Sequence, residues 1–390
     1  MTHLINEERL KSHLEELGYI GAEEKHGRTR IAYTPEYNVG RDLVKSWMDE
    51  AGLATSVDTV GNLFGVKKGK SNKVILIGSH IDTVPEAGIY DGCLGVLGAI
   101  EAIQTLNERH IELDHTIKIA AWIDEEGTAI GGLFGSRAYS GLPIDESFKN
   151  RFDQYDMTMD KFESAKSNDD VDYYLELHIE QGGILDDKKI SIGIVQAIVA
   201  IFRWTVNMKG QANHAGTTPM YLRDDAMLKT AKFVSRYDEL VRQHEGMVGT
   251  IGKIRAFPGT FNIIPERVKF SCEMRSVNVE DMNEVWQQML DEFGDVIEYQ
   301  QDFKQDAVVM DDKVKQSIKS AAEKLGLSCM DINSGAGHDT QSIASVTRPG
   351  MLFVPSVHGI SHSPKEYTTW KDCANGANVL MHTVCNLDLL

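Results

Sequence analysis

The pattern of hydrophobic and polar positions changes several times along the chain. Apolar side chains recur at helical spacing over 4–17 and 39–51, which predicts two amphipathic surface helices. Short β-branched runs at 73–77 and 116–123 then predict buried strands, and 95–106 between them has the pattern of a buried helix. This order of strand, helix and strand is typical of a doubly wound α/β domain, whose ligands bind at the carboxyl edge of the sheet.

A second kind of pattern follows in the middle of the chain. The elements expected there are the strands 202–210, 246–256 and 267–277 and the helices 223–242 and 279–293. Two helices with alternating strands indicate an inserted α+β domain. A helical pattern at 311–325 and a buried strand at 351–355 indicate that the first domain then resumes.

Composition limits the classes of function. A chain of 390 residues, 42% of them hydrophobic, has material for two or three compact domains. Its net charge of −18 disfavours binding to nucleic acid or to anionic lipid. The 5 cysteines form no CxxC pair and predict no disulfide framework. Residues 1–15 have no apolar signal segment, and no apolar run is long enough to span a bilayer, so we expect a soluble cytoplasmic protein.

Histidines and carboxylates gather in a few short segments. These are GSHIDTVPEAGIYDG at 78–92, DEEG at 124–127, ELHIEQG at 176–182, GQANHAGTTP at 210–219 and GISHSP at 359–364. Asp and Glu are rarely buried, so Glu125 and Glu126 after an apolar strand need a cation, a partner or water. A divalent ion would fill this need, with the candidate ligands His80, Asp91, Glu126, His178 and His362. Imidazole with carboxylate suits zinc and, less selectively, manganese, cobalt or nickel.

Each segment taken alone also has a purely structural interpretation. DEEG could cap a helix before a solvated turn, and GAGHD at 335–339 could be a tight turn. A single histidine near a strand end is more often a hydrogen-bonded structural residue than a ligand. The coincidence of several polar clusters at predicted strand ends favours a functional site.

Taken together, these segments resemble the amidase, hydantoinase and carbamoylase branch of the M20 metallopeptidase superfamily. The other elements that carry the resemblance are GNLFG at 61–65, LFGSRAYSG at 133–141, RDDA at 223–226, FNIIP at 261–265, SGAGHD at 334–339 and FVPSVHGISHSP at 353–364. The resemblance implies a zinc-peptidase-like α/β catalytic domain, with a mixed central sheet flanked by helices, formed by 1–199 and 311–390. It also implies an inserted α+β lid domain at 200–310 that forms the contact of a homodimer.

The resemblance further implies two divalent ions per subunit. The implied ligands are His80 and His178 for one ion, Glu126 and His362 for the other, and Asp91 as the bridge. Asp82 would receive the imidazole N–H of His80, and Glu125 would be the general base. Two ions can share a hydroxide and polarise a carbonyl, and Glu125 can pass the proton of the water to the departing nitrogen. In an extended segment Glu125 and Glu126 would point to opposite sides, which would let them act separately.

Substrate contacts are implied by the same resemblance. The residues assigned to the substrate are Gln181, Asn262, Arg275 and His338. His214 would stabilise the developing oxyanion, reaching in from the partner subunit. An arginine fork suits a substrate carboxylate, although a salt bridge from Arg275 to Glu273 is an alternative for this side chain. The loop 128–132 departs from the usual pattern of the branch, so the substrate does not follow from the motifs.

The activity that the resemblance implies is hydrolysis of the carbamoyl amide of an N-carbamoyl-L-amino acid or a related ureido acid to amine, CO2 and ammonia. Allantoate is an alternative substrate with the same reacting groups. An aminoacylase or dipeptidase is a second alternative, although peptidase relatives generally have an acidic residue where His178 stands. A binding protein without catalysis is the alternative from another class, and the presence of all candidate ligands and of the base Glu125 disfavours it.

Overall fold

The computed structural model describes residues 3–23 and 26–390. Its contacts divide the chain into two compact units. Unit 1 consists of Met1–Gln196 and Val309–Leu390, and unit 2 of Ala197–Val308. These bounds lie close to those predicted for the insertion at 200–310, while the catalytic and lid roles of the two units stay predictions.

Unit 1 is built on a mixed β-sheet. Its strands are β3 (Ala54–Val57), β4 (Leu63–Lys67), β5 (Val74–His80), β6 (Thr116–Trp122), β7 (Val171–Ile179), β8 (Ile192–Ile198), β14 (Val308–Val309), β15 (Cys329–Ser334) and β16 (Arg348–Val354). Among the described residues the order is β14-β8-β16-β7-β5-β6-β4-β3, with β15 beside β8. The central strands β16, β7, β5 and β6 run parallel, and β4 and β8 join them antiparallel. The carboxyl ends of the central strands therefore meet at one edge.

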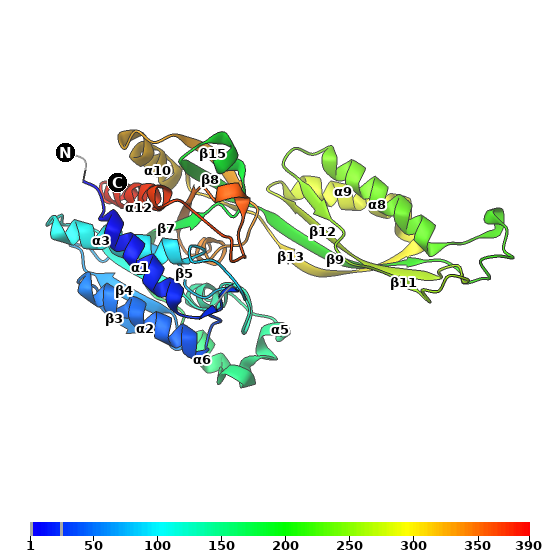
Figure 1. Ribbon diagram of the computed structural model, residues 1–390, viewed down its shortest axis with the longest axis horizontal. Helices are drawn as coiled ribbons and strands as arrows, with labels where there is room; N and C mark the ends of the chain where they lie inside the picture. The colour runs from blue at the N-terminus through cyan, green and yellow to red at the C-terminus, as the bar shows by residue number, and fades with distance from the viewer. Residues whose placement is uncertain (1–2, 24–25) are drawn as a thin grey trace. The chain divides into compact units, whose positions relative to one another are not determined.

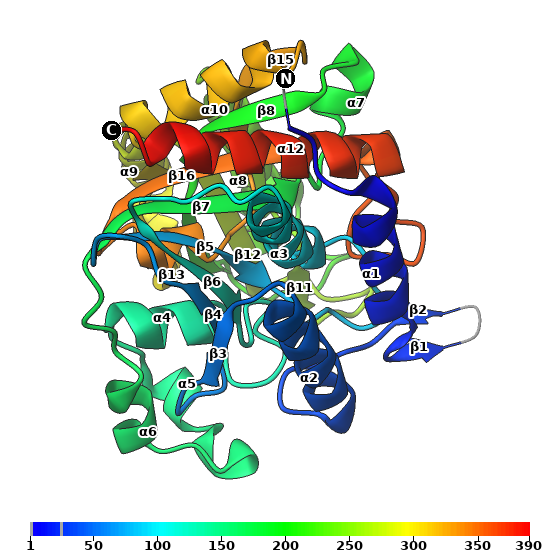
Figure 2. The same cartoon turned by 90° about the vertical axis from the view of Figure 1, so that its left-hand side faces the viewer.

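Helices cover both faces of this sheet. The longer ones are α1 (Glu7–Tyr19), α2 (Pro35–Glu50), α3 (Cys93–Glu108), α10 (Asp312–Lys324) and α12 (Trp370–Leu387). The shorter elements are α4 (Phe134–Ser140), α5 (Glu146–Lys149), α6 (Met159–Ser164), α7 (Ile184–Lys188), α11 (Thr340–Ile343), the 3-10 turns η1 (Phe152–Tyr155) and η4 (Val357–Gly359), and the small ribbon of β1 (Ala22–Glu23) and β2 (Gly27–Arg28). Helices α3 and α12 lie side by side over the central strands (Figure 2).

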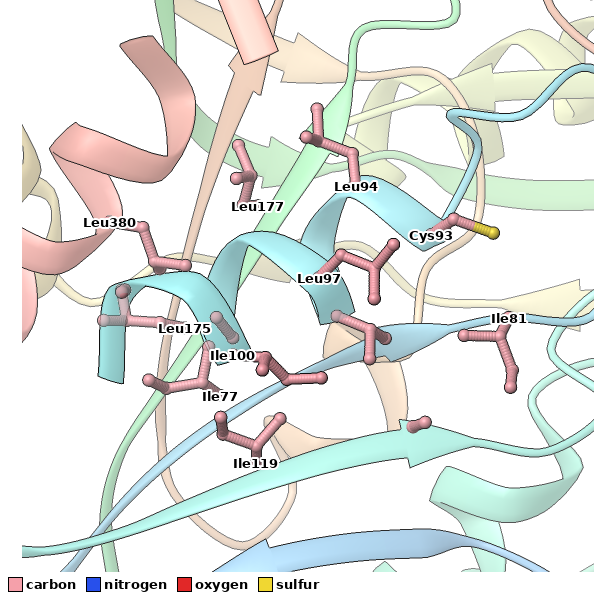
Figure 3. Close-up of a cluster of buried hydrophobic side chains, with 14 of the residues drawn as sticks. Ile77, Ile81, Cys93, Leu94, Leu97, Ile100, Ile119, Leu175, Leu177 and Leu380 are labelled. Atoms are coloured by element: carbon pink, nitrogen blue, oxygen red, sulfur yellow. The ribbon is translucent and has the colours of Figure 1, made fainter. Parts of the chain in front are cut away.

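The core of unit 1 lies between α3 and the parallel strands. Figure 3 shows the fully buried side chains of this core, among them Leu94, Leu97, Ile100, Ile77, Ile119, Leu175, Leu177 and Leu380. Gly95 permits the close approach of α3 to β7, because a Cβ there would lie 2.3 Å from the carbonyl oxygen of Leu177. This packing fixes the start of α3, at Cys93, beside the carboxyl ends of β5 and β7.

The elements predicted for unit 1 are present, with shifted ends. The strand expected over 73–77 continues to His80, because the backbone of β5 stays in register with β6 as far as the pair of His80 and Trp122. The mixed sheet flanked by helices confirms the predicted α/β class.

Unit 2 is an antiparallel sheet with two helices. Its elements are β9 (Ala200–Lys209), β10 (Val248–Thr250), β11 (Ile254–Phe257), β12 (Arg267–Ser276), β13 (Ile297–Gln305), α8 (Ala226–Arg242), α9 (Val279–Phe293) and the 3-10 turns η2 (Met220–Leu222) and η3 (Gly294–Val296). The order over the described residues is β10-β12-β9-β13, and β11 also pairs with β12. Figure 1 shows α8 and α9 together on one face of this sheet. Trp204 of β9 stacks on Trp286 of α9 with ring centroids 4.1 Å apart.

Two features of unit 2 differ from the sequence expectations. The run 246–256 was expected to form one strand but forms β10 and β11, which pair with different ends of β12. Strand β13 was not predicted, because its sequence IEYQQDFKQ is mostly polar and exposed. It is held by its backbone pairing to β9.

Two expectations about the whole chain can be compared with the structure. The 5 cysteines are all free thiols, as expected from their spacing. Across residues 3–23 and 26–390, no helix is long and apolar enough to cross a membrane.

Candidate metal centre

Two histidines stand at the carboxyl ends of neighbouring strands. His80 is the last residue of β5, and His178 lies near the end of β7. The Nδ1 atom of His80 lies 3.0 Å from the backbone oxygen of Asp82, and Nδ1 of His178 lies 2.9 Å from that of Ile179. Because a carbonyl oxygen only accepts hydrogen bonds, each Nδ1 carries a proton, which in the neutral ring leaves the lone pair on Nε2. Both Nε2 atoms face Asp91.

Asp91 stands between two groups of candidate ligands. Its Oδ1 lies 3.2 Å from Nε2 of His178 and 3.8 Å from Nε2 of His80. Its Oδ2 lies 3.1 Å from Nε2 of His362, which is in turn 3.5 Å from Oε2 of Glu126. The structure thus brings together the five predicted ligands as two groups of three that share Asp91.

The donor set fits divalent metal. Oδ1 of Asp91 and Nε2 of His178 are both buried, and neither makes a hydrogen bond of acceptable geometry although they are neighbours. Buried polar atoms without a partner are uncommon in folded proteins. Zinc bonds of about 2.0–2.2 Å in a tetrahedral site place neighbouring ligand atoms roughly 3.3–3.6 Å apart. The nitrogen–oxygen distances in the two groups, 3.1 to 3.8 Å, include this range.

The DEEG segment is bent rather than extended. The prediction that an extended backbone points Glu125 and Glu126 to opposite sides is therefore wrong. Asp124 has a left-handed backbone, with φ 56°, and its carboxylate accepts three successive backbone N–H groups of 129–131. The two glutamates nevertheless diverge. Oε2 of Glu125 lies 3.6 Å from Nε2 of His80, whereas Glu126 faces His362.

Asp82 has a different contact from the predicted one. The imidazole N–H of His80 donates to the backbone oxygen of Asp82, and the Asp82 carboxylate is 3.8 Å from that Nδ1. The carboxylate instead accepts the backbone N–H groups of Glu125 and Glu126, at 3.3 and 3.2 Å. Asp82 therefore fixes the backbone of both glutamates, and burial raises its pKa to about 6.

Negative charge is concentrated at this edge of the sheet. Burial, followed by the charges of Glu126 and Asp339, raises the pKa of Glu125 well above its ordinary value. Burial and the nearby Asp91 carboxylate likewise raise the pKa of Glu126. A cation between these groups would relieve both the desolvation and the mutual repulsion.

Two further predicted residues of unit 1 lie beside the ligands. Gln181 has a left-handed backbone, with φ 56°, and its Nε2 donates to Oδ2 of Asp91 at 2.9 Å. His338 is only 1% exposed, its Nε2 lies 2.8 Å from Oγ of Ser334, and its ring packs edge-on against His178 at a centroid distance of 4.5 Å. His338 thus supports the ring of His178, and its contact with substrate stays a prediction.

His214 and Asn262 lie on adjacent segments of unit 2. The backbone N–H of Ala215 donates to the backbone oxygen of Asn262 at 3.0 Å. Nδ1 of the exposed His214 accepts the N–H groups of Gly216 and Thr217, at 3.0 and 3.2 Å. Since Nδ1 accepts, the proton of the neutral ring is on Nε2, which makes that atom a hydrogen-bond donor.

Arg275 forms the salt bridge that was the alternative to its predicted role. Its Nε donates to Oε1 of Glu273 at 2.8 Å, and Arg203 bonds to the other oxygen of the same carboxylate. Arg203 of β9 and Arg275 of β12 thus share the carboxylate of Glu273. The role of Arg275 in substrate binding stays a prediction.

Three buried carboxyl groups beside the ligands were missed: Glu176, Asp339 and Glu366. Glu176 accepts hydrogen bonds from Ser79, Tyr174 and Thr340. Its position two residues before His178 on one strand, and so on the same face, was a signal in the sequence. Glu366 follows GISHSP by two residues and has no comparable signal.

Known proteins resemble this chain over nearly its whole length. The model of peptidase family M20/M25/M40 matches residues 76–386. The chain is 37% identical to an N-carbamoyl-L-amino acid amidohydrolase of Geobacillus stearothermophilus, over 98% of this chain and 99% of that protein. It is 34% identical to an allantoate amidohydrolase of Bacillus subtilis, over 95% of both.

A solved structure supports the same assignment. The crystal structure of an amidase of the hydantoinase/carbamoylase family from Burkholderia multivorans matches with a TM-score of 0.89 and 32% identity, over 98% of each chain. These matches confirm the fold class and the predicted resemblance. The chain belongs to peptidase family M20/M25/M40 and is an amidohydrolase of its hydantoinase and carbamoylase branch.

Proposed function

We propose that this protein hydrolyses the carbamoyl amide of an N-carbamoyl-L-amino acid or a related ureido acid to amine, CO2 and ammonia. The observation that carries the proposal is the pair of ligand groups sharing Asp91, with the carboxylate of Glu125 beside them. The names of the relatives support a ureido or amide acid as the substrate. Allantoate is the second candidate, because one relative has that name and the reacting groups are the same.

Two divalent ions per subunit complete the proposed site. His80, Asp91 and His178 would hold one ion, and Asp91, Glu126 and His362 the other. Zinc is the first choice, with manganese, cobalt or nickel as alternatives, because imidazole and carboxylate suit all four. When bound, such ions polarise a carbonyl group and lower the pKa of water.

Glu125 is the proposed general base. Its carboxylate takes a proton from the attacking water and delivers it to the nitrogen that leaves. The contact of Oε2 with the edge of His80 and the bond from the Glu125 N–H to Asp82 support this role, because they aim the side chain at the ligand cluster. Asp82 is therefore a positioning residue for the base.

The remaining roles fall to polar groups that can recognise the substrate. In unit 2, the Nε2 proton of His214 would stabilise the developing oxyanion, and Asn262 and Arg275 would bind the amide and the carboxylate. In unit 1, Gln181 would bind the substrate beside Asp91, with His338 behind His178. We place the protein in the cytoplasm, which its free cysteines support.

We also propose that the protein is a homodimer joined through unit 2. The sheet edge at β10 and β11 carries Val248 and Ile254, which are 57% and 55% exposed, and Leu228 on α8 is 49% exposed. Exposed apolar strands at a sheet edge favour pairing with a second chain.

The dimer predicts a mass of twice the chain mass of 43.4 kDa in sedimentation equilibrium. Placing charge at the edge, with Ile254→Lys, is expected to shift the protein toward monomer. Val39→Lys on α2, which is 58% exposed in unit 1, is the matched control and leaves the mass unchanged. A wild-type protein that sediments as monomer at every concentration contradicts the proposed dimer.

The substrate is tested by measuring ammonia release from N-carbamoyl-L-amino acids and allantoate, and the appearance of free amino groups from N-acetyl amino acids and dipeptides. We expect release from ureido acids and little cleavage of dipeptides. Preference for allantoate would select the second candidate. Cleavage of dipeptides without ammonia release would instead show an aminoacylase or peptidase activity.

Removal of metal with a chelator is expected to abolish turnover and to lower the midpoint of thermal unfolding by several degrees. The physical reason is that an ion at 100 times its Kd stabilises the native state by about 2.7 kcal/mol. Adding Zn²⁺ or Mn²⁺ back restores both quantities. A midpoint that is the same before and after complete chelation, confirmed by metal analysis, would exclude ions as part of the native fold.

Replacing the base, Glu125→Gln, is expected to lower kcat about 10²- to 10⁴-fold while two ions still bind, because the amide cannot accept the proton of water. Turnover and metal content are measured on the same preparation. Glu284→Gln on the exposed side of α9 is the control and keeps full activity. Unaltered turnover in Glu125→Gln would refute the assignment of the base.

A further inference from the structure

Glu366 is a buried carboxylate behind the ligand cluster. It lies in the loop between η4 and α12 and is 6% exposed. Its Oε1 accepts the backbone N–H groups of Tyr90 and Asp91, at 3.0 and 3.1 Å. A carboxylate that accepts successive N–H groups fixes the local backbone, here at the residue that carries the shared ligand.

The other oxygen of Glu366 contacts the loop of a second ligand. Oγ of Ser361 lies 3.1 Å from Oε2 of Glu366 and 3.2 Å from Oδ2 of Asp91. Ser361 directly precedes His362. A single carboxylate therefore joins the loop of Asp91 to the loop of His362, although these ligands are about 270 residues apart in the sequence.

Glu366 packs tightly against the chain segment that precedes Asp91. A Cβ placed on Gly88 would lie 2.4 Å from Oε1 of Glu366, so the carboxylate lies directly against the backbone before Asp91. The ring of Tyr90, next to Asp91, packs against the rings of Tyr367 and Trp370, which follow Glu366 in the chain. The centroid distances are 6.0 and 5.6 Å. Aromatic packing and hydrogen bonds thus hold the two loops together.

The ligands on these loops need such support more than the other two histidines. His80 and His178 belong to β5 and β7, whose backbones are fixed by the sheet. His362 lies outside any strand or helix and has φ 52°, a left-handed conformation that a residue with a Cβ keeps only when its surroundings hold it.

We propose that Glu366 is a positioning residue that holds Asp91 and His362 at the spacing required by the second metal ion. The inference rests on the metal centre of the proposed function and deepens it. The ion held by Asp91, Glu126 and His362 depends on Glu366, whereas the ion held by the strand residues His80 and His178 depends on it less.

Stepwise binding of Zn²⁺ to the metal-free full-length protein, measured by competition with a chromophoric chelator, tests this role. Glu366→Ala is expected to weaken the second binding step about 10- to 100-fold, as is typical for partners of metal ligands, and the first step less. Glu366→Gln keeps an oxygen that accepts both N–H groups, so its second step stays close to that of the unaltered protein. Ser361→Ala removes the link alone and weakens the same step to a smaller extent.

Asp388→Ala is the matched control. The Asp388 side chain is 8% exposed and also accepts two successive backbone N–H groups, from Asp114 and His115, at 3.0 and 2.7 Å. It touches none of the candidate ligands, so both zinc steps should stay unchanged. A loss of the second step in this variant as well would mean that general destabilisation, rather than positioning, causes the effect.

Several results would overturn the inference. One is an unchanged second step in Glu366→Ala; another is a loss in Glu366→Gln as large as in Glu366→Ala. An unaltered protein that binds fewer than two zinc ions would also overturn it. If two ions bind but no ureido acid is cleaved, the proposed substrate fails while the zinc titration still decides the role of Glu366, so the two failures are distinguishable.

Discussion

The carboxylate of Asp91 faces His80 and His178 with one oxygen and His362 with the other, in a region that also buries glutamates. Burial and neighbouring charge raise the pKa values of Glu125 and Glu126, and raise that of Glu366 to about 7. Burying a charged carboxylate costs free energy, and contacts with positive groups or with N–H donors offset that cost. The backbone N–H groups beside Asp91 and a metal ion bound by the donor set would therefore both offset the cost of burying these carboxylates.

The fold holds the candidate ligands in place in two ways. Strands β5 and β7 present their histidines with fixed backbones, and carbonyl oxygens set the tautomers. The other candidate ligands lie on loops, where side chains bond to the backbone: the Asp82 carboxylate accepts the N–H of Glu126, and the Glu366 carboxylate accepts the N–H of Asp91. The sheet alone would not fix the positions of the loop residues Asp91, Glu126 and His362. A metal site requires its ligands to be correctly placed before the ion binds.

The sequence predicts what depends on short-range pattern and fails where distant contacts decide. The five candidate ligands were predicted from polar segments at the ends of expected strands, and β5 and β6 were evident from their β-branched runs. Strand β13 was not predicted because most of its side chains are polar and exposed, although its backbone pairs with β9. The bend at Asp124 and the bond of His80 to a backbone oxygen depend on tertiary contacts. Glu366 is a lone acidic residue in a loop, and the backbone N–H groups that bond to it lie about 275 residues away.

The residues of unit 2 that we propose for substrate binding are also held in place by their neighbours. Two backbone N–H groups fix the tautomer of His214, so its Nε2 is a donor without need of protonation of the ring. Glu273 fixes the guanidinium plane of Arg275, while Arg203 leaves the trio with net charge +1. On a chain of net charge −18, an anionic substrate is repelled except near such a cationic cluster. Nε2 of His214 and the guanidinium of Arg275 would therefore add a hydrogen-bond donor and a positive charge to those that metal ions in unit 1 would supply to an oxyanion and an acid.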